Sequence, residues 1–265
     1  MNRLLDHLKG ALDPPIRAHR LCFVHIPKCG GTTLVHAIQA CFSPWRMNRS
    51  KQVFNLSEPA ARRAQETTGR SFEETRSSLL DYALAIPTTR CVLGHFVVSS
   101  KCFEAHAEEW EFVTVLRDPV DRLLSHYFYN LNAPGAYAIT SELGEFLQTP
   151  EAANLGMQYP IYLGGDVRPG GDARSDLCSD EAIDQTIASL RNFSLVGRLN
   201  QLDDFAARFR QRFGGKLKLE RRNVGDRRKR EDQLEAVEKH LPLIREICRP
   251  DLAVYEALFG DSGNG

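Results

Sequence analysis

The stretch "LCFVHIPKCGGTTLVHAIQACF", residues 21–42, decides the fold of this chain. Its first six residues, 21–26, form a short apolar run that ends at Pro27, which is typical of a buried strand. The later residues of the stretch place apolar side chains at helical spacing. Gly30 and Gly31 therefore lie in a turn between a strand and a helix, which is the topology of a phosphate-binding loop.

A helix N-terminus binds anions because its first backbone N–H groups lack intrahelical acceptors and the helix dipole is positive there. The predicted ligands of the anion are the residues of one loop: Lys28, Cys29, Gly30, Gly31, Thr32 and Thr33. We expect Cys29 to offer mainly its backbone, and the two threonines to add hydroxyl donors. Taken alone, the loop can also be read as an ordinary tight turn with a threonine cap.

The lysine of this loop precedes the glycines, whereas in the G-x-x-x-x-G-K-[ST] loop of nucleotide triphosphatases it follows them. Lys28 would therefore lie beside the bridging oxygen of the bound group rather than over a phosphate chain. That position suits the stabilisation of a leaving oxygen without a metal ion.

A second motif, "VTVLRDPVDRLLSHYFYN", occupies residues 113–130. It predicts a strand ending at Arg117, a turn, and a helix that has Pro119 in its first turn. Ser125 follows Arg117 by eight residues, so a guanidinium and a hydroxyl can converge on one anion near the helix start. This pair suits a second phosphate group.

The remaining pattern predicts an α/β fold. Further short strands are expected at 90–96 and 193–197, helices at 180–191 and 202–214, and one or two closing helices. Because strands alternate with helices, we predict a three-layer, P-loop-like fold with a central parallel sheet flanked by helices. Residues 1–20 are expected to be an N-terminal extension and 21–265 a single domain, within which 132–176 is an insertion or lid.

Composition narrows the class of protein. The chain has 265 residues, 42% of them hydrophobic, which is enough for a sizeable core. Lys plus Arg and Asp plus Glu both number 34, so no overall field favours nucleic acid as a partner. Seven scattered cysteines without a C-x-x-C pair argue against disulfides and a zinc site. No stretch resembles a signal peptide or membrane span, so a cytoplasmic protein without an integral membrane segment is expected.

The two motifs together resemble those of a known family. "HIPKCGGTTL" and "VLRDPVDRLLSHYFY" are similar to the motifs by which sulfotransferases bind 3'-phosphoadenosine 5'-phosphosulfate (PAPS). They look most like the carbohydrate branch, which contains the heparan sulfate 2-O-sulfotransferases and many bacterial relatives. Further similarities are "LGHF" at 93–96, "LVGRLNQLDDF" at 195–205 and "RRNVG" at 221–225.

The resemblance implies roles for these residues. The loop would hold the 5'-phosphosulfate, with Lys28 on the bridging oxygen, while Arg117 and Ser125 would hold the 3'-phosphate. Arg221, Arg222 and Asn223 would lie near the 3'-phosphate or the adenine, although this basic run can also be read as a solvated loop. The implied activity is metal-free transfer of a sulfuryl group from PAPS to a hydroxyl of a carbohydrate or glycoconjugate, with 3',5'-adenosine bisphosphate as the other product. A bacterial cytoplasmic enzyme fits this sequence best.

A base must take the proton of the acceptor hydroxyl, and histidine suits this because its usual pKa is near neutrality. His95 follows Gly94 at the end of a predicted strand, and the resemblance implies that this histidine is the catalytic base. Glu58 and Glu104 are the fallback bases. His25, His36 and His126 are interpreted as packing residues.

Two alternatives remain open from the sequence. One is a metal-dependent P-loop nucleotide kinase, for which Asp118 would be the metal ligand. The other is a non-catalytic module that binds a nucleotide or a glycan. The aromatic stretch 127–162 and the basic cluster 227–230 are candidate acceptor contacts, but neither identifies the acceptor.

Overall fold

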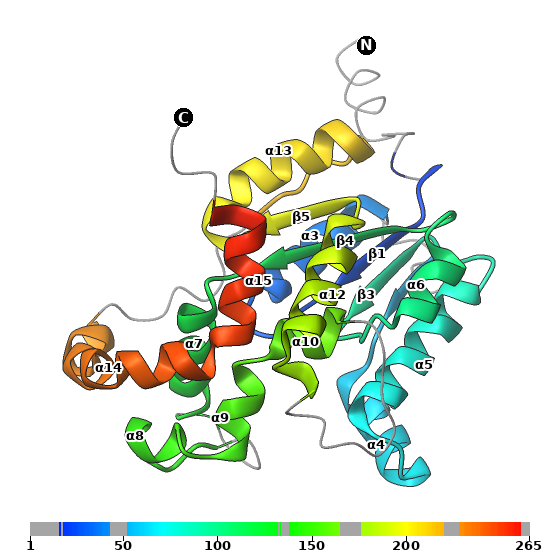
Figure 1. Ribbon diagram of the computed structural model, residues 1–265. Coiled ribbons are helices and arrows are strands. Elements are labelled where there is room, and N and C mark those ends of the chain that lie inside the picture. The colour runs from blue at the N-terminus through cyan, green and yellow to red at the C-terminus, as the bar shows by residue number, and fades with distance from the viewer. Residues whose placement is uncertain are drawn as a thin grey trace.

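The computed structural model describes residues 16, 18–42, 52–131, 133, 138–164, 176–219 and 228–260. In this part of the chain, five strands form one parallel sheet in the order β2-β3-β1-β4-β5 (Figure 1). The strands are β1 (Leu21–Val24), β2 (Val53–Asn55), β3 (Cys91–Gly94), β4 (Glu111–Leu116) and β5 (Leu195–Arg198). Helices flank the sheet, so the predicted α/β fold with a central parallel sheet is confirmed.

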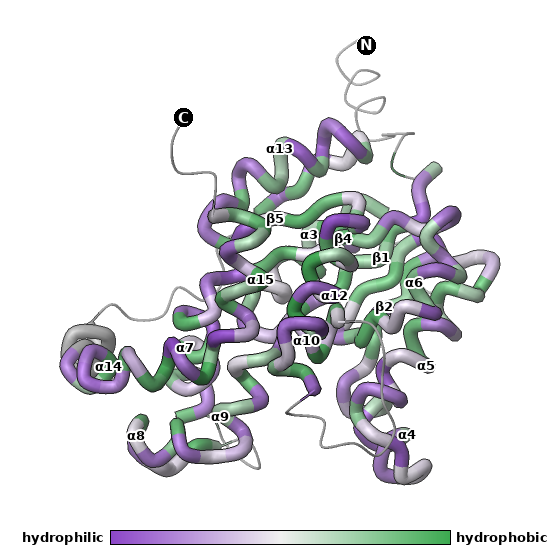
Figure 2. Tube along the Cα trace, in the orientation of Figure 1, coloured by the Kyte–Doolittle hydropathy of each residue, from purple (hydrophilic) through white to green (hydrophobic). Residues whose placement is uncertain are grey.

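Successive side chains of a strand point to opposite faces of the sheet, so the strands contribute to two separate cores. Leu21 and Phe23 of β1 pack against the helices of one face, α3 (Gly31–Phe42) and α13 (Leu202–Phe213). Cys22 and Val24 point to the other face. The helices there are α5 (Phe72–Ala85), α6 (Ser100–His106), α10 (Gln158–Leu163), α12 (Asp180–Arg191) and α15 (Arg249–Phe259). Figure 2 shows apolar strands between helices whose outer sides are hydrophilic, as expected for a sheet buried on both faces.

A third apolar cluster lies beside the sheet (Figure 1). Its helices are α7 (Pro119–Asn130), α8 (Leu143–Phe146), α9 (Pro150–Leu155) and α14 (Arg228–Ile247). α8, α9 and α10 fall within residues 132–176, the segment predicted to be an insertion or lid. Phe146 and Tyr159 of these helices are buried, so this part of the segment contributes to the protein core.

Several helix boundaries follow from local sequence signals. Ser71 and Glu74 form a capping box at the start of α5, and Gly214 ends α13 in the left-handed conformation with φ of 74°. The remaining elements are α4 (Glu58–Thr68) and the 3-10 turn η1 (Leu199–Gln201). No helix in the described ranges is both long and apolar enough to cross a bilayer.

The parallel sheet brings chemically important residues to one edge. His25 follows β1, His95 follows β3 and Arg117 follows β4. Val24 is in register with Gly94, and the His25 N–H donates to the Gly94 carbonyl at 2.8 Å. Because the carboxyl ends of parallel strands share an edge, segments far apart in sequence meet there.

Candidate active site

The loop between β1 and α3 curls around the helix N-terminus. Lys28 and Gly30 both adopt left-handed backbone conformations, with φ of 64° and 76°. The Leu34 N–H donates to the Gly30 carbonyl at 3.3 Å, so the N–H groups of the preceding turn point towards the loop. Burial raises the pKa of the Cys29 thiol to about 12, and the neutral side chain packs in the core. The Cys29 N–H donates to the Ile26 carbonyl at 3.3 Å, so this group is engaged within the loop, and the contribution of the Cys29 backbone to an anion site stays a prediction.

Gly31 packs directly against the imidazole of His25. A Cβ at position 31 would lie 1.6 Å from His25 Nε2, so a side chain cannot be accommodated without moving the ring. The His25 ring in turn stacks on the His95 ring, with centroids 4.0 Å apart and an interplanar angle of 29°. His25 is therefore a spacer between the loop and the predicted base, which gives a specific role to a residue that the sequence indicated only as packing.

The hydrogen bonding of His95 defines its tautomer. Its Nδ1 lies 2.6 Å from the carbonyl oxygen of His25, which can only accept a hydrogen bond. Nδ1 therefore carries the proton, and Nε2 keeps its lone pair. Burial, the main cause, holds the pKa of His95 below its usual value. The ring is neutral at pH 7 and can accept a proton at Nε2.

An ion pair between the buried Arg76 and the exposed Glu58 supports the backbone of His95. The Arg76 guanidinium donates to both carboxylate oxygens of Glu58, at 2.7 and 2.6 Å, and also to the carbonyl of His95 at 3.2 Å. Burial opposes ionisation of Glu58, but the hydrogen bonds and charge of Arg76 outweigh it and keep the pKa of Glu58 below its usual value. A carboxylate stabilised in this way is a weak base, and Glu104, the other fallback, is exposed on α6.

Lys28 lies among groups that disfavour its charge. Burial, and secondly the nearby Arg117, lower the pKa of Lys28 to about 8. Arg117 Nη1 donates to the Lys28 carbonyl at 3.3 Å, so two of the predicted anion ligands are adjacent. The Lys28 ammonium lies 3.5 Å from the ring centroid of Tyr129, on α7. No pattern in the sequence indicated this aromatic contact.

Arg117 is supported by a buried tyrosine that sequence reasoning missed. The Tyr159 hydroxyl accepts from the Arg117 N–H at 3.1 Å and donates to the Arg117 carbonyl. Ser125, the other predicted ligand of the 3'-phosphate, is half-buried on α7. Asp118 caps this helix, since its carboxylate accepts from the Asp121 N–H at 3.0 Å. The carboxylate required by the metal-dependent alternative is therefore engaged in a helix cap.

The second arginine of the same motif has a structural role. Arg122 is fully buried and lies 2.8 Å from the equally buried Asp251 of α15. Asp251 also accepts from the backbone N–H groups of Gln158 and Tyr159, at 3.1 and 2.8 Å. This network joins α7, α10 and α15 beneath the loop.

The structure also leaves some predicted residues aside. Arg221, Arg222 and Asn223 lie outside the described residues.

Among the described residues, Asp81, Cys102 and His106 bring possible metal-ligand atoms within 4.8 Å of one another, away from the loop. His106 Nε2 already pairs with Asp81 at 2.9 Å, and burial raises the pKa of the Cys102 thiol to about 12. A neutral thiol beside a histidine and a carboxylate that already hydrogen-bond to each other gives no reason to add a metal to the site.

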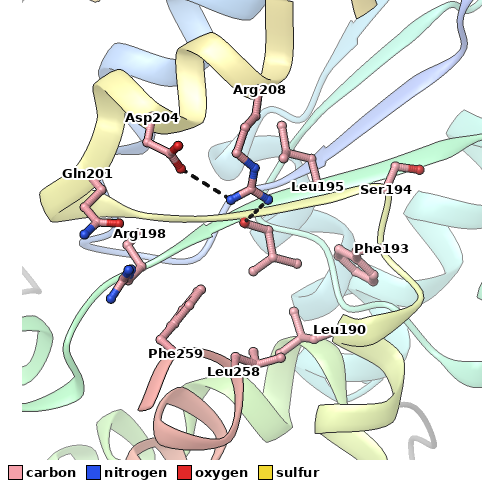
Figure 3. Close-up of a pocket in the computed structure, with 11 residues that line it drawn as sticks. Leu190, Phe193, Ser194, Leu195, Arg198, Gln201, Asp204, Arg208, Leu258 and Phe259 are labelled. Carbon is pink, nitrogen blue, oxygen red and sulfur yellow. Dashed lines mark hydrogen bonds and ion pairs between the residues drawn. The ribbon is translucent and has the colours of Figure 1, made fainter. Parts of the chain in front are cut away.

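A cavity of about 350 Å³ lies along the edge strand β5 (Figure 3). The Arg198 guanidinium lies 5.1 Å from the ring centroid of Phe259, while Arg208 donates to the Val196 carbonyl and pairs with Asp204. Leu199, next to Arg198, packs against Gly30 of the loop. One end of the cavity therefore lies near the loop, whereas the rest extends between α12, α13 and α15.

Comparison with known proteins adds one finding. A family model described as "Sulfotransferase family" matches residues 16–259, which is nearly the whole chain. No curated protein matches the sequence. The matched range includes the loop, His95, Arg117 and Ser125.

Proposed function

We propose a specific reaction for this chain, which belongs to the sulfotransferase family. In this reaction PAPS is the donor, and a sulfuryl group moves to a hydroxyl of a carbohydrate or glycoconjugate. The observation that supports the proposal most is the contact, through His25, between the predicted base and the loop that carries Lys28. His95, a neutral base with its lone pair on Nε2, stacks through His25 on the loop that carries Lys28.

The donor would bind across the edge of the sheet. The first turn of α3 would hold the 5'-phosphosulfate, and Arg117 with Ser125 would hold the 3'-phosphate. Lys28 and Arg117 are adjacent and cationic, and this environment favours an anion because the two charges otherwise repel each other. Arg221, Arg222 and Asn223 remain proposed ligands of the nucleotide.

In the chemical step, the acceptor oxygen forms a bond to sulfur while the bond from sulfur to the bridging oxygen breaks. His95 Nε2 takes the proton of the acceptor hydroxyl. The electron pair of the broken bond stays on the 5'-phosphate of 3',5'-adenosine bisphosphate, where the Lys28 ammonium and the loop N–H groups stabilise the new charge. The scheme assigns every step to residues of this chain and needs no metal ion.

The acceptor class rests on the similarity of the two motifs to the carbohydrate branch of the family. The similarity extends to bacterial relatives of that branch, and a bacterial, cytoplasmic enzyme remains part of the proposal. An acceptor hydroxyl must come within hydrogen-bonding distance of His95 Nε2 and in line with the sulfur, so sugars that cannot reach this point will not react.

Titration calorimetry tests the donor. We expect 3',5'-adenosine bisphosphate to bind without magnesium and to bind more tightly than ATP with magnesium. The reverse order would favour the nucleotide kinase and overturn the proposal.

A transfer assay with donor labelled in the sulfuryl group tests the reaction and the acceptor together. Glycans, lipids and phenols form the panel, and label is expected on glycans. Binding of the nucleotide with no labelled product from any class, under conditions where a known sulfotransferase reacts, would favour the non-catalytic module.

A further inference from the structure

Lys28 of the loop and Tyr129 of α7 form a cation–π contact. The side chain of Tyr129 is one of the large apolar groups that the structure leaves exposed, with 65% of its surface accessible. The Lys28 ammonium nevertheless lies 3.5 Å from the centroid of its ring. This distance is well inside the range over which a cation is attracted to an aromatic face.

The surroundings of Lys28 explain why the contact matters. Arg117, at the end of β4, and His126, on α7, are the titratable groups that interact with Lys28. The first is cationic and the second is held neutral chiefly by burial. In the described part of the chain no carboxylate pairs with Lys28. The Tyr129 ring, in contact with the ammonium, is thus a group that favours a protonated Lys28 side chain.

The sequence positions Tyr129 for this contact. Tyr129 follows Ser125 by four residues on α7, so the two side chains share a helix face. The face that carries the proposed 3'-phosphate ligand therefore also carries the ring beneath Lys28. The left-handed backbone of Lys28 turns its side chain out of the loop towards that face.

We propose that Tyr129 is a positioning residue, which holds the Lys28 ammonium protonated and directed along α7 until the donor binds. This inference rests on the proposed function. The ring touches neither the sulfur nor the acceptor, and it acts through Lys28. The attraction raises the proton affinity of Lys28 in the empty enzyme, and it fixes a flexible side chain near the place where the bridging oxygen arrives.

The test measures Lys28 directly and needs no activity. The protein without nucleotide is labelled with acetic anhydride at a series of pH values, and mass spectrometry of the Lys28 peptide gives the pKa from the reaction rate. Tyr129→Leu removes the ring, and we expect it to lower the pKa of Lys28 by about half to one unit. Tyr129→Phe keeps the ring, and the Lys28 pKa should stay within about 0.2 units of the wild-type value.

Tyr82→Leu is the matched control, because Tyr82 is equally exposed but packs on Phe54, away from the loop. It should leave the Lys28 pKa unchanged. An unchanged Lys28 pKa in Tyr129→Leu, with the fold intact by circular dichroism, would overturn the inference. A shift without any sulfuryl transfer would leave the inference standing and count against the proposed function instead.

Kinetics supply a second measurement. If the reaction requires protonated Lys28, the alkaline limb of kcat/KM should move to lower pH in Tyr129→Leu by the same amount, and Tyr129→Phe should restore it. A uniform loss of activity at all pH values would indicate a merely structural role and contradict the inference.

Discussion

Arg117 and Arg122 come from one motif, yet they lie in two different regions of the molecule. Arg117 lies at the carboxyl edge of the sheet, half-buried beside Lys28, where a ligand can reach it. Arg122 belongs to a buried network with Asp251 and the α10 backbone, which we call the anchor. Lys28 and Arg117 lie side by side at the edge and are proposed to bind an anion together, whereas Arg122 in the anchor pairs with the buried Asp251. Edge variants should therefore lose turnover and anchor variants should lose stability.

The largest effect on turnover is expected at His95. His95→Ala should lower kcat by about 10²–10⁴-fold with an identified acceptor, because the base is lost. In the wild type, kcat/KM should rise as the pH passes through the pKa of His95, because only the neutral ring accepts a proton. This pKa lies below the usual value for histidine. At higher pH, kcat/KM should fall again around pH 8, because Lys28 loses its proton there. An acidic limb that persists in His95→Ala would contradict the assignment of the base.

The largest effect on stability is expected in the anchor. Arg122→Ala leaves the buried Asp251 without its partner and should cost about 3–5 kcal/mol in the free energy of unfolding, measured with urea. Arg208→Ala, which breaks an exposed pair with Asp204, should cost about 0.5 kcal/mol or less. Replacing Arg122 and Asp251 together by leucine should recover only part of the loss, because the backbone N–H groups of Gln158 and Tyr159 then lose their acceptor. Equal costs for Arg122→Ala and Arg208→Ala would remove the distinction between anchor and surface.

Replacement of Lys28 should affect the chemical step far more than the binding of the nucleotide. Lys28→Ala should reduce kcat by about 10²–10³-fold, because the charge on the bridging oxygen develops only in the transition state. Calorimetry should show a much smaller loss of affinity for 3',5'-adenosine bisphosphate. An equal loss in both measurements would mean that Lys28 serves only to bind the nucleotide.

The smallest of these effects concerns the spacer. Gly31→Ala brings a Cβ within 2 Å of three atoms of the His25 ring, so the ring must shift against His95. We expect a cost of about 1–3 kcal/mol in stability and a loss of turnover. Gly69→Ala is the control, because its Cβ meets nothing within 4 Å and only the left-handed backbone is strained, at about 1–2 kcal/mol. Turnover that survives Gly31→Ala would show that the His25 stack is dispensable.

Much of the fold was predictable because local signals agree with the tertiary structure. The strands β1 and β4, the helix that stops on Gly214 and the order of elements all followed from apolar periodicity and caps, although β1 ends at Val24, two residues before the predicted end. The three-residue strand β2 did not, because Val53–Asn55 is too short to show a period and lies in a polar region. Its pairing with β3 defines it as a strand.

The sequence by itself determined the strand, turn and helix around residues 28–31, because glycine tolerates the left-handed backbone that such a tight turn requires. Only the tertiary structure decided which groups surround that loop. The His25 carbonyl selects the tautomer of His95, Tyr129 lies against Lys28, and Asp251 pairs with Arg122. Each of these contacts joins residues at least 70 positions apart in the sequence, and no local pattern carries that information. Long-range packing and the desolvation of charges therefore set the chemistry of a site whose place was visible in the sequence.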